Sequence, residues 1–110
     1  MAYSKDEVIA LIRTFVEDLR RDFPINRAFL FGSYARGQIK DYSDIDLALI
    51  CPAITSANSF ELNQKIFHRA MLFNVELEPI CFSPEEFEQE QLPIIQDIKQ
   101  SGVEIAVPSE

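Results

Sequence analysis

The sequence contains few residues of several types that build common protein sites: one histidine, two cysteines and three glycines among 110 residues. A single histidine excludes His-rich zinc centres. No run of about 18 consecutive apolar residues occurs, which argues against a membrane-spanning helix. The first residues, Met1 to Glu7, lack the basic and then apolar order of a signal peptide. We therefore expect a cytoplasmic protein with no membrane association.

Cations are also scarce, since ten Lys and Arg residues stand against eighteen Asp and Glu residues, for a net charge of −8. Neutralising phosphates requires clustered cations, so we expect no direct binding of nucleic acid. Residues 41–110 carry three cations and thirteen acids, a net charge of −10, whereas residues 1–40 carry a net charge of +2. This balance suits a metal-dependent site or a basic protein partner.

Cysteine use indicates no disulfide framework. Cys51 and Cys81 each lie at the end of an apolar run. In a cytoplasmic chain such residues are expected to be reduced, half-buried core thiols. Hydrophobic residues make up 47% and charged residues 25% of the chain, which is ordinary for a soluble globular domain. The length predicts one domain over residues 1–110.

Hydrophobic periodicity predicts alternating helices and strands, and therefore an α/β layer fold with a mixed sheet of about four strands flanked by helices. The predicted helices are Ser4–Asp22, Phe60–Leu72, one that begins at Ser83, and Pro93–Gln100. A Ser followed three residues later by a Glu predicts the starts at Ser4 and Ser83. The predicted strands are Arg27–Phe31, Ile45–Ile50, Val75–Phe82 and Val103–Val107. On the second long helix, the residues expected to share the buried face are Leu62, Ile66, Phe67 and Ala70.

Gly32 and Gly37 lie five residues apart, directly after the first predicted strand. Glycine at a turn from strand to helix lets the backbone approach a ligand closely. The amides that follow, from Ser33 onward, are helix N-terminal donors that attract phosphate. A Walker A loop is excluded because Gln38 and Ile39, rather than Lys and Ser or Thr, follow the second glycine.

Asp44 and Asp46 lie two residues apart at the start of the buried strand, so both side chains are expected on one face. Two carboxylates so close together repel each other unless a cation lies between them. Carboxylate oxygens suit Mg²⁺, which commonly takes one or two carboxylates and substrate phosphates.

Glu76 and Glu78 alternate with apolar residues on the third predicted strand, so both are expected on one face. Val75 and Leu77 are expected on the opposite face, toward the core or a covering helix. If this strand neighbours Ile45–Ile50, one of the two glutamates can reach the aspartate pair. Three carboxylates could then hold two metal ions. Pro79 has no N–H and predicts an edge position or an interrupted ladder.

Together these elements resemble the nucleotidyltransferase superfamily related to DNA polymerase β. The match consists of the Gly32-Ser33 turn, ten intervening residues, the Asp44-X-Asp46 pair and an acid on a later strand. The surrounding sequences resemble the minimal nucleotidyltransferases of prokaryotes, namely Phe31 to Gly37, Ser43 to Leu47 and Phe82 to Phe87. The resemblance covers about residues 27–90.

The resemblance implies a polymerase β-like nucleotidyltransferase fold and assigns roles to individual residues. It implies that Gly32, Ser33 and Arg36 bind the nucleotide, and that Asp44 and Asp46 bind metal and act in catalysis. The third acid falls on Glu78 by the family's register, with Glu76 as the alternative. The implied cofactor is Mg²⁺, as two ions, with ATP as substrate.

The resemblance further implies transfer of a nucleoside monophosphate, with AMP from ATP the expected case, to a hydroxyl group. Family members of this size are typically antitoxins paired with a helical HEPN ribonuclease toxin, which implies a hetero-oligomer, or a homodimer of the isolated chain. The acidic residues that could face a basic partner, or form only a solvated helix face, are Glu85, Glu86, Glu88 and Glu90. Two alternatives stay open: an antitoxin that neutralises its partner by binding alone, and the catalytic subunit of a two-chain small-molecule nucleotidyltransferase.

Overall fold

The computed structural model describes residues 3–38 and 44–107 and contains a four-stranded sheet in the order β3-β2-β1-β4. In chain order the elements are α1 (Lys5–Leu19), β1 (Arg27–Phe31), α2 (Ser33–Arg36), β2 (Ile45–Ile50), α3 (Ser59–Phe73), β3 (Leu77–Phe82), α4 (Pro84–Gln89), α5 (Pro93–Ser101) and β4 (Val103–Ile105). Strand β1 is antiparallel to β2 and β4, whereas β2 and β3 are parallel and are connected through α3. The predicted α/β fold with a mixed sheet is confirmed.

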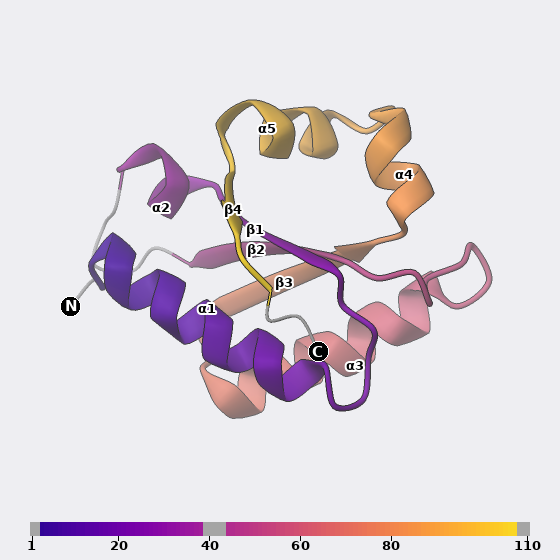
Figure 1. Cartoon of the computed structure of the whole chain (residues 1–110), viewed down its shortest axis with the longest axis horizontal. Helices are drawn as coiled ribbons and strands as arrows, with labels where there is room; N and C mark the ends of the chain where they lie inside the picture. Colours follow the sequence, from indigo (N-terminus) through magenta and orange to yellow (C-terminus); the bar gives the residue numbers. More distant parts are fainter. Residues whose placement is uncertain (1–2, 39–43, 108–110) are drawn as a thin grey trace.

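The two faces of the sheet are covered by different helices (Figure 1). Leu47 and Leu49 of β2 belong to the core that includes buried residues of α1 and α3. Ala48 and Ile50 belong to a second core with buried residues of α4 and α5. Because side chains alternate along a strand, Asp46 lies on the same face as Ala48 and Ile50, the face of α4 and α5.

Helices α1 and α4 begin directly after Ser4 and Ser83, the residues at which short polar motifs predict helix starts. At the start of α1, the Ser4 amide donates to Glu7 Oε1 at 2.9 Å, and the Glu7 amide donates to Ser4 Oγ at 3.2 Å. Ser83 and Glu86 form the same reciprocal pair at the start of α4. Each capping box satisfies amides that have no acceptor within the helix.

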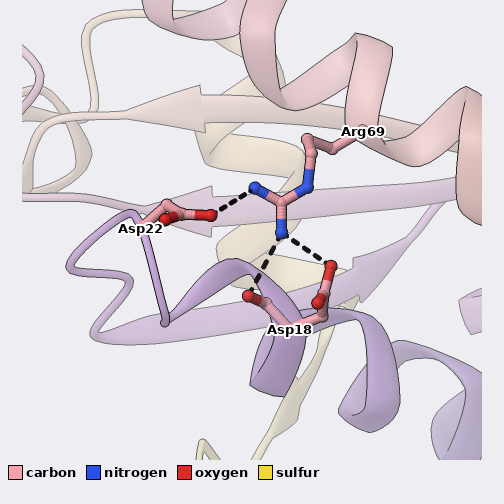
Figure 2. Close-up of polar contacts among 3 residues, drawn as sticks. All are labelled: Asp18, Asp22 and Arg69. Carbon is pink, nitrogen blue, oxygen red and sulfur yellow. Dashed lines mark hydrogen bonds and ion pairs between the residues drawn. The ribbon is translucent and has the colours of Figure 1, made fainter.

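Arg69 of α3 connects the helices on the other face of the sheet (Figure 2). Its guanidinium donates to Asp18 Oδ2 at 2.7 Å and to Asp22 Oδ2 at 2.7 Å. The hydrogen bond from Arg69 lowers the pKa of Asp18 below its ordinary value. This contact fixes the carboxyl end of α1 against α3.

Several sequence-based expectations about these elements are wrong in detail, among them strand Val103–Val107, because β4 ends at Ile105. Strand β3 begins at Leu77, and Val75, which was expected to face the core, is 78% exposed. The cause is Asn74, whose Oδ1 and carbonyl oxygen accept from the amides of Glu76 and Leu77 and close a turn there. Phe67, expected on the buried face of α3, is 42% exposed. Helix α1 ends at Leu19 rather than at Asp22.

Both cysteines are free, as predicted, and they are buried rather than half-buried. Burial, together with the nearby Cys51, raises the pKa of Cys81 to about 12. A thiol with that pKa is protonated and inert at neutral pH. In the described part of the chain, the helices are too short or too polar to span a bilayer.

Candidate active site

The candidate site lies where β2 and β3 begin, on the face of the sheet that α4 and α5 cover. In the parallel register Asp46 pairs with Glu78, so these side chains are neighbours on one face. Asp46 is also paired with Phe31, the last residue of β1. Asp44 precedes β2, and its carboxylate interacts with both Asp46 and Glu78. The fold thus brings together Asp44, Asp46 and Glu78, which we call the carboxylate cluster.

Electrostatics within the carboxylate cluster oppose full ionisation. Burial, and then the charges of Glu78 and Asp44, raise the pKa of Asp46 to about 6, while Arg36 acts in the opposite direction. Burial and the charge of Asp44 also raise the pKa of Glu78, and a hydrogen bond to Asp44 adds to this effect. A bound cation would relieve the repulsion, so the cluster fits a divalent metal.

Glu76 does not belong to the carboxylate cluster. It lies in the turn before β3, where its amide donates to Asn74 Oδ1 at 2.8 Å and its carbonyl oxygen accepts from the Ile45 amide at 2.8 Å. The expectation that Glu76 and Glu78 alternate along one strand is therefore wrong. The charges that raise the pKa of Asp46 come from Glu78 and Asp44.

The carboxylate cluster is not by itself a complete metal site. Within residues 3–38 and 44–107, no three His, Cys, Asp or Glu side chains are arranged to hold an ion. Mg²⁺ commonly completes its shell with substrate phosphates and water beside one or two carboxylates. The donor set therefore fits Mg²⁺ that arrives together with a nucleotide.

Gly32 lies directly against Asp46. Its backbone has φ 72° and ψ −148°, a conformation that is essentially restricted to glycine. A Cβ atom there would overlap Asp46 Oδ2 and lie 3.0 Å from Asp46 Cγ. Glycine is required here both for the turn and for the approach of the backbone to the carboxylate.

Helix α2 follows at once, so its N-terminus lies beside Asp46. The first amides of a helix have no acceptor within the helix, and those of Ser33 to Ala35 are in this position. Tyr34 anchors α2 because it is buried in the core and its Oη accepts from the Tyr3 amide at 3.3 Å. No local sequence pattern marks Tyr34 as this anchor.

Arg36, at the end of α2, forms an ion pair with Asp97 of α5. Asp97 also accepts from the Ser101 hydroxyl at 3.2 Å, so α5 holds the guanidinium in place. Arg36 is close enough to Asp46 to lower the pKa of that carboxyl group. Asp97 was missed from the sequence because 61 residues separate it from Arg36 and no local pattern marks the pair.

The family model for the nucleotidyltransferase domain matches residues 12–107. The chain belongs to this family. It is therefore a nucleotidyltransferase, as the Gly-Ser turn and the Asp-X-Asp pair predicted. The matched range contains α2, the carboxylate cluster and both helices that cover the site face.

Curated relatives of this nucleotidyltransferase domain include two proteins that are provisionally named protein adenylyltransferases. One, from Methanocaldococcus jannaschii, is 28% identical over 102 residues, which are 90% of this chain and 99% of the relative. The other, MntA of Haemophilus influenzae, is 39% identical over 46 residues, which are 42% of this chain and 38% of the relative.

Solved structures share the nucleotidyltransferase fold. A protein from Sulfolobus solfataricus, provisionally assigned as a nucleotidyltransferase, superposes with a TM-score of 0.58 at 22% identity, covering 94% of this chain and 87% of the other. A chain of a toxin–antitoxin complex solved with AMP-PNP gives a TM-score of 0.57 at 21% identity, covering 97% and 76%. At these identities the likeness establishes the fold alone.

Proposed function

We propose that this nucleotidyltransferase transfers AMP from ATP to a hydroxyl group on a partner protein. The observation that carries the proposal is the contact of the Gly32 backbone with Asp46, beside Asp44 and Glu78. This contact brings the N-terminus of α2, which in this proposal binds phosphate, next to a set of carboxylate oxygens. The provisional naming of both curated relatives as protein adenylyltransferases supports a protein acceptor.

In this proposal Asp44, Asp46 and Glu78 hold two Mg²⁺ ions, and Gly32, Ser33 and Arg36 bind the nucleotide phosphates. Bound Mg²⁺ would offset the negative charge that develops on the phosphates during transfer. The acceptor hydroxyl gives its proton to a carboxylate of the cluster, its oxygen forms a bond to the α-phosphorus, the bond from that phosphorus to the bridging oxygen breaks, and pyrophosphate leaves. In this proposal Arg36, which is paired with Asp97, orients the leaving phosphates.

Direct transfer fits the other side chains better than a covalent intermediate does. Cys81 is buried, and its pKa of about 12 makes it a poor nucleophile. Ser33 has no histidine partner among its hydrogen bonds in the described part of the chain. A nucleophilic serine needs such a base.

We further propose that the partner is a HEPN ribonuclease toxin and that the chain acts as its antitoxin in a cytoplasmic hetero-oligomer. Support comes from the fold shared with a chain of a toxin–antitoxin complex, and from the net charge of −8, which suits a basic partner.

The test uses the protein encoded by the reading frame next to this one. That protein is incubated with the chain, ATP and Mg²⁺, and its intact mass is measured. We expect a mass increase of one or more AMP units with the wild-type chain and none with the Asp44→Asn, Asp46→Asn double variant. Ribonuclease activity of the neighbour is measured in parallel, before and after transfer.

Two other outcomes would replace the proposal. Loss of ribonuclease activity without a mass change, equal for wild type and double variant, would indicate neutralisation by binding alone. AMP transfer to a small molecule only when both chains are present would indicate the catalytic subunit of a two-chain enzyme.

A further inference from the structure

An apolar groove lies between α3 and the free edge of β3, apart from the site face. Its apolar walls are Phe60, Phe67 and Met71 of α3 and Pro79 of β3, and we call it the α3–β3 groove. Phe60 is 76%, Met71 49% and Phe67 42% exposed. The three α3 residues recur at intervals of seven and four, so they form one stripe along the helix. The groove volume is about 560 Å³.

This stripe is not needed to attach α3 to the sheet. Ile66 and Ala70 lie about 100° around the helix from this stripe and are fully buried in the core. The remaining lining of the α3–β3 groove consists of two neutral amide side chains and His68. Contiguous exposed apolar surface of this kind marks interaction sites in soluble proteins.

The occupant of the α3–β3 groove cannot be a β-strand, because the outer edge of β3 offers no N–H for pairing. Register places Leu77, Pro79 and Cys81 with their backbone groups toward that edge. The Leu77 amide donates to the Asn74 carbonyl at 3.1 Å, and Pro79 has no N–H. The Cys81 amide donates to Asn63 Oδ1 at 2.8 Å. An occupant must therefore pack side chains into the groove, as an amphipathic helix does.

Charge indicates whether the occupant of the α3–β3 groove is a second copy of this chain or a different protein. A second copy would carry the same net charge of −8, so self-association would bring like charges together. At the Phe60 end of the groove, Ser59 lines a second pocket together with Glu85 and Glu86 of α4. Both glutamates are exposed. An apolar groove with an acidic end is complementary to a helix that carries basic residues at one end.

We propose that the α3–β3 groove binds an amphipathic helix of a partner protein, with apolar side chains against Phe60 and Met71 and Lys or Arg beside Glu85 and Glu86. The other end of the groove includes Pro79, which directly follows Glu78. Because side chains alternate along a strand, Pro79 faces α3 whereas Glu78 faces the carboxylate cluster, so a docked helix lies on the other side of the sheet from the cluster. The inference deepens the proposed function, on which it rests for the identity of the partner as acceptor.

The test uses a labelled model helix with leucines at positions i, i+4, i+7 and i+11 and lysines at one end, and measures its binding by fluorescence anisotropy. We expect saturable binding by the wild-type chain and at least about tenfold weaker binding by the Phe60→Ser, Met71→Ser variant. Glu85→Gln with Glu86→Gln should weaken binding by about threefold and reduce its salt dependence. Leu92→Ser, which removes an exposed leucine outside the groove, should leave binding unchanged.

Several results would overturn the proposal. They are no binding of the helix, equal binding of a version with glutamates in place of the lysines, or equal binding by the Phe60→Ser, Met71→Ser variant. A wild-type chain that sediments as a dimer and becomes a monomer in that variant would show that a second copy fills the groove. Thermal melting of each variant checks that it is folded.

The same helix also separates this inference from the proposed function. The Asp44→Asn, Asp46→Asn variant should bind the helix as wild type does. Failure of AMP transfer with retained helix binding would reject the enzymatic proposal alone.

Discussion

The carboxylate cluster and the α3–β3 groove both lower the stability of the isolated chain, for opposite reasons. In the cluster, burial and then like charges raise the pKa of Asp46 to about 6. In the groove, apolar side chains such as Phe60, at 76% exposure, meet water with no charged residue in the lining. A bound cation with a nucleotide relieves only the charge repulsion in the cluster. The apolar surface of a partner relieves only the exposure of the groove to water. The two regions are therefore expected to respond independently to mutation.

The largest expected effect is that of replacing both aspartates of the carboxylate cluster. Asp44→Asn with Asp46→Asn should reduce AMP transfer by about 10³-fold or more, because each carboxylate is a preorganised electrostatic group. Stability without ligand should not fall, since the change removes repulsion. Transfer is measured by acceptor mass, and stability by urea unfolding. Loss of the fold in this variant would contradict the separation of the two regions.

A pair of conservative variants on either side of the start of β3 sharpens the assignment of the third acid. Glu78→Gln should reduce AMP transfer by about 10²-fold, because Glu78 neighbours Asp46 in the parallel register. Glu76→Gln, in the turn outside the cluster, should reduce AMP transfer by less than about tenfold. Equal small losses would mean that β3 supplies no metal ligand.

The two glycines that flank α2 provide a matched test of the contact with Asp46. Gly32→Ala should destabilise the fold by about 2 kcal/mol and abolish nucleotide binding, because the new Cβ overlaps the Asp46 carboxylate. Gly37 has a similar φ of 73°, but a Cβ there would meet nothing within 4 Å. Gly37→Ala should therefore lower the free energy of unfolding by only about 1 kcal/mol and leave nucleotide binding intact.

Urea unfolding and the thermal shift on addition of Mg²⁺ with ATP distinguish the two glycine variants. Equal destabilisation of both, with nucleotide binding retained in both, would show that the contact with Asp46 is not needed by the site.

Much of the site follows from local sequence patterns. Alternation along a strand places Asp46 on a defined face, and an apolar run predicts that β2 is central. Asp44 and Asp46 could therefore be paired from their spacing alone, and Ser83 with Glu86 predicted the start of α4. These features depend on neighbours within a few residues, which the sequence records directly.

Other features depend on contacts between distant segments and left no local pattern. Asp97 meets Arg36 only because β4 pairs with β1 and carries α5 across the site face. The choice between Glu76 and Glu78 depended on Asn74, whose side chain closes a turn and delays the start of β3. Phe67 fits the helical period of the buried face, yet the position of the β3 edge leaves it partly exposed.

The smallest expected effect is a dependence of stability on pH that comes from the carboxylate cluster. The pKa of Asp46 rises from its ordinary value of 3.8 to about 6 in the folded chain. Between these values the folded state holds a proton that the unfolded state has lost, so the free energy of unfolding falls as pH rises through this range. Above about pH 6 the penalty is constant. Glu78, whose pKa is also raised, acts in the same direction.

Asp46→Asn removes this penalty and isolates the contribution of one carboxylate. At about pH 4 the variant and the wild type should unfold at nearly the same urea concentration, because Asp46 is protonated in the folded wild type. At about pH 7 the free energy of unfolding of the variant should exceed that of the wild type by about 1 kcal/mol. This value is smaller than the one that the full pKa shift would give, because solvent screens the charge of a half-buried carboxylate. Mg²⁺ with ATP should reverse the order at neutral pH, since only the wild type retains the metal-binding carboxylate. If the variant is instead less stable than wild type at neutral pH without ligand, Asp46 stabilises the fold. The carboxylate cluster would then not destabilise the isolated chain, and its contrast with the α3–β3 groove would be lost.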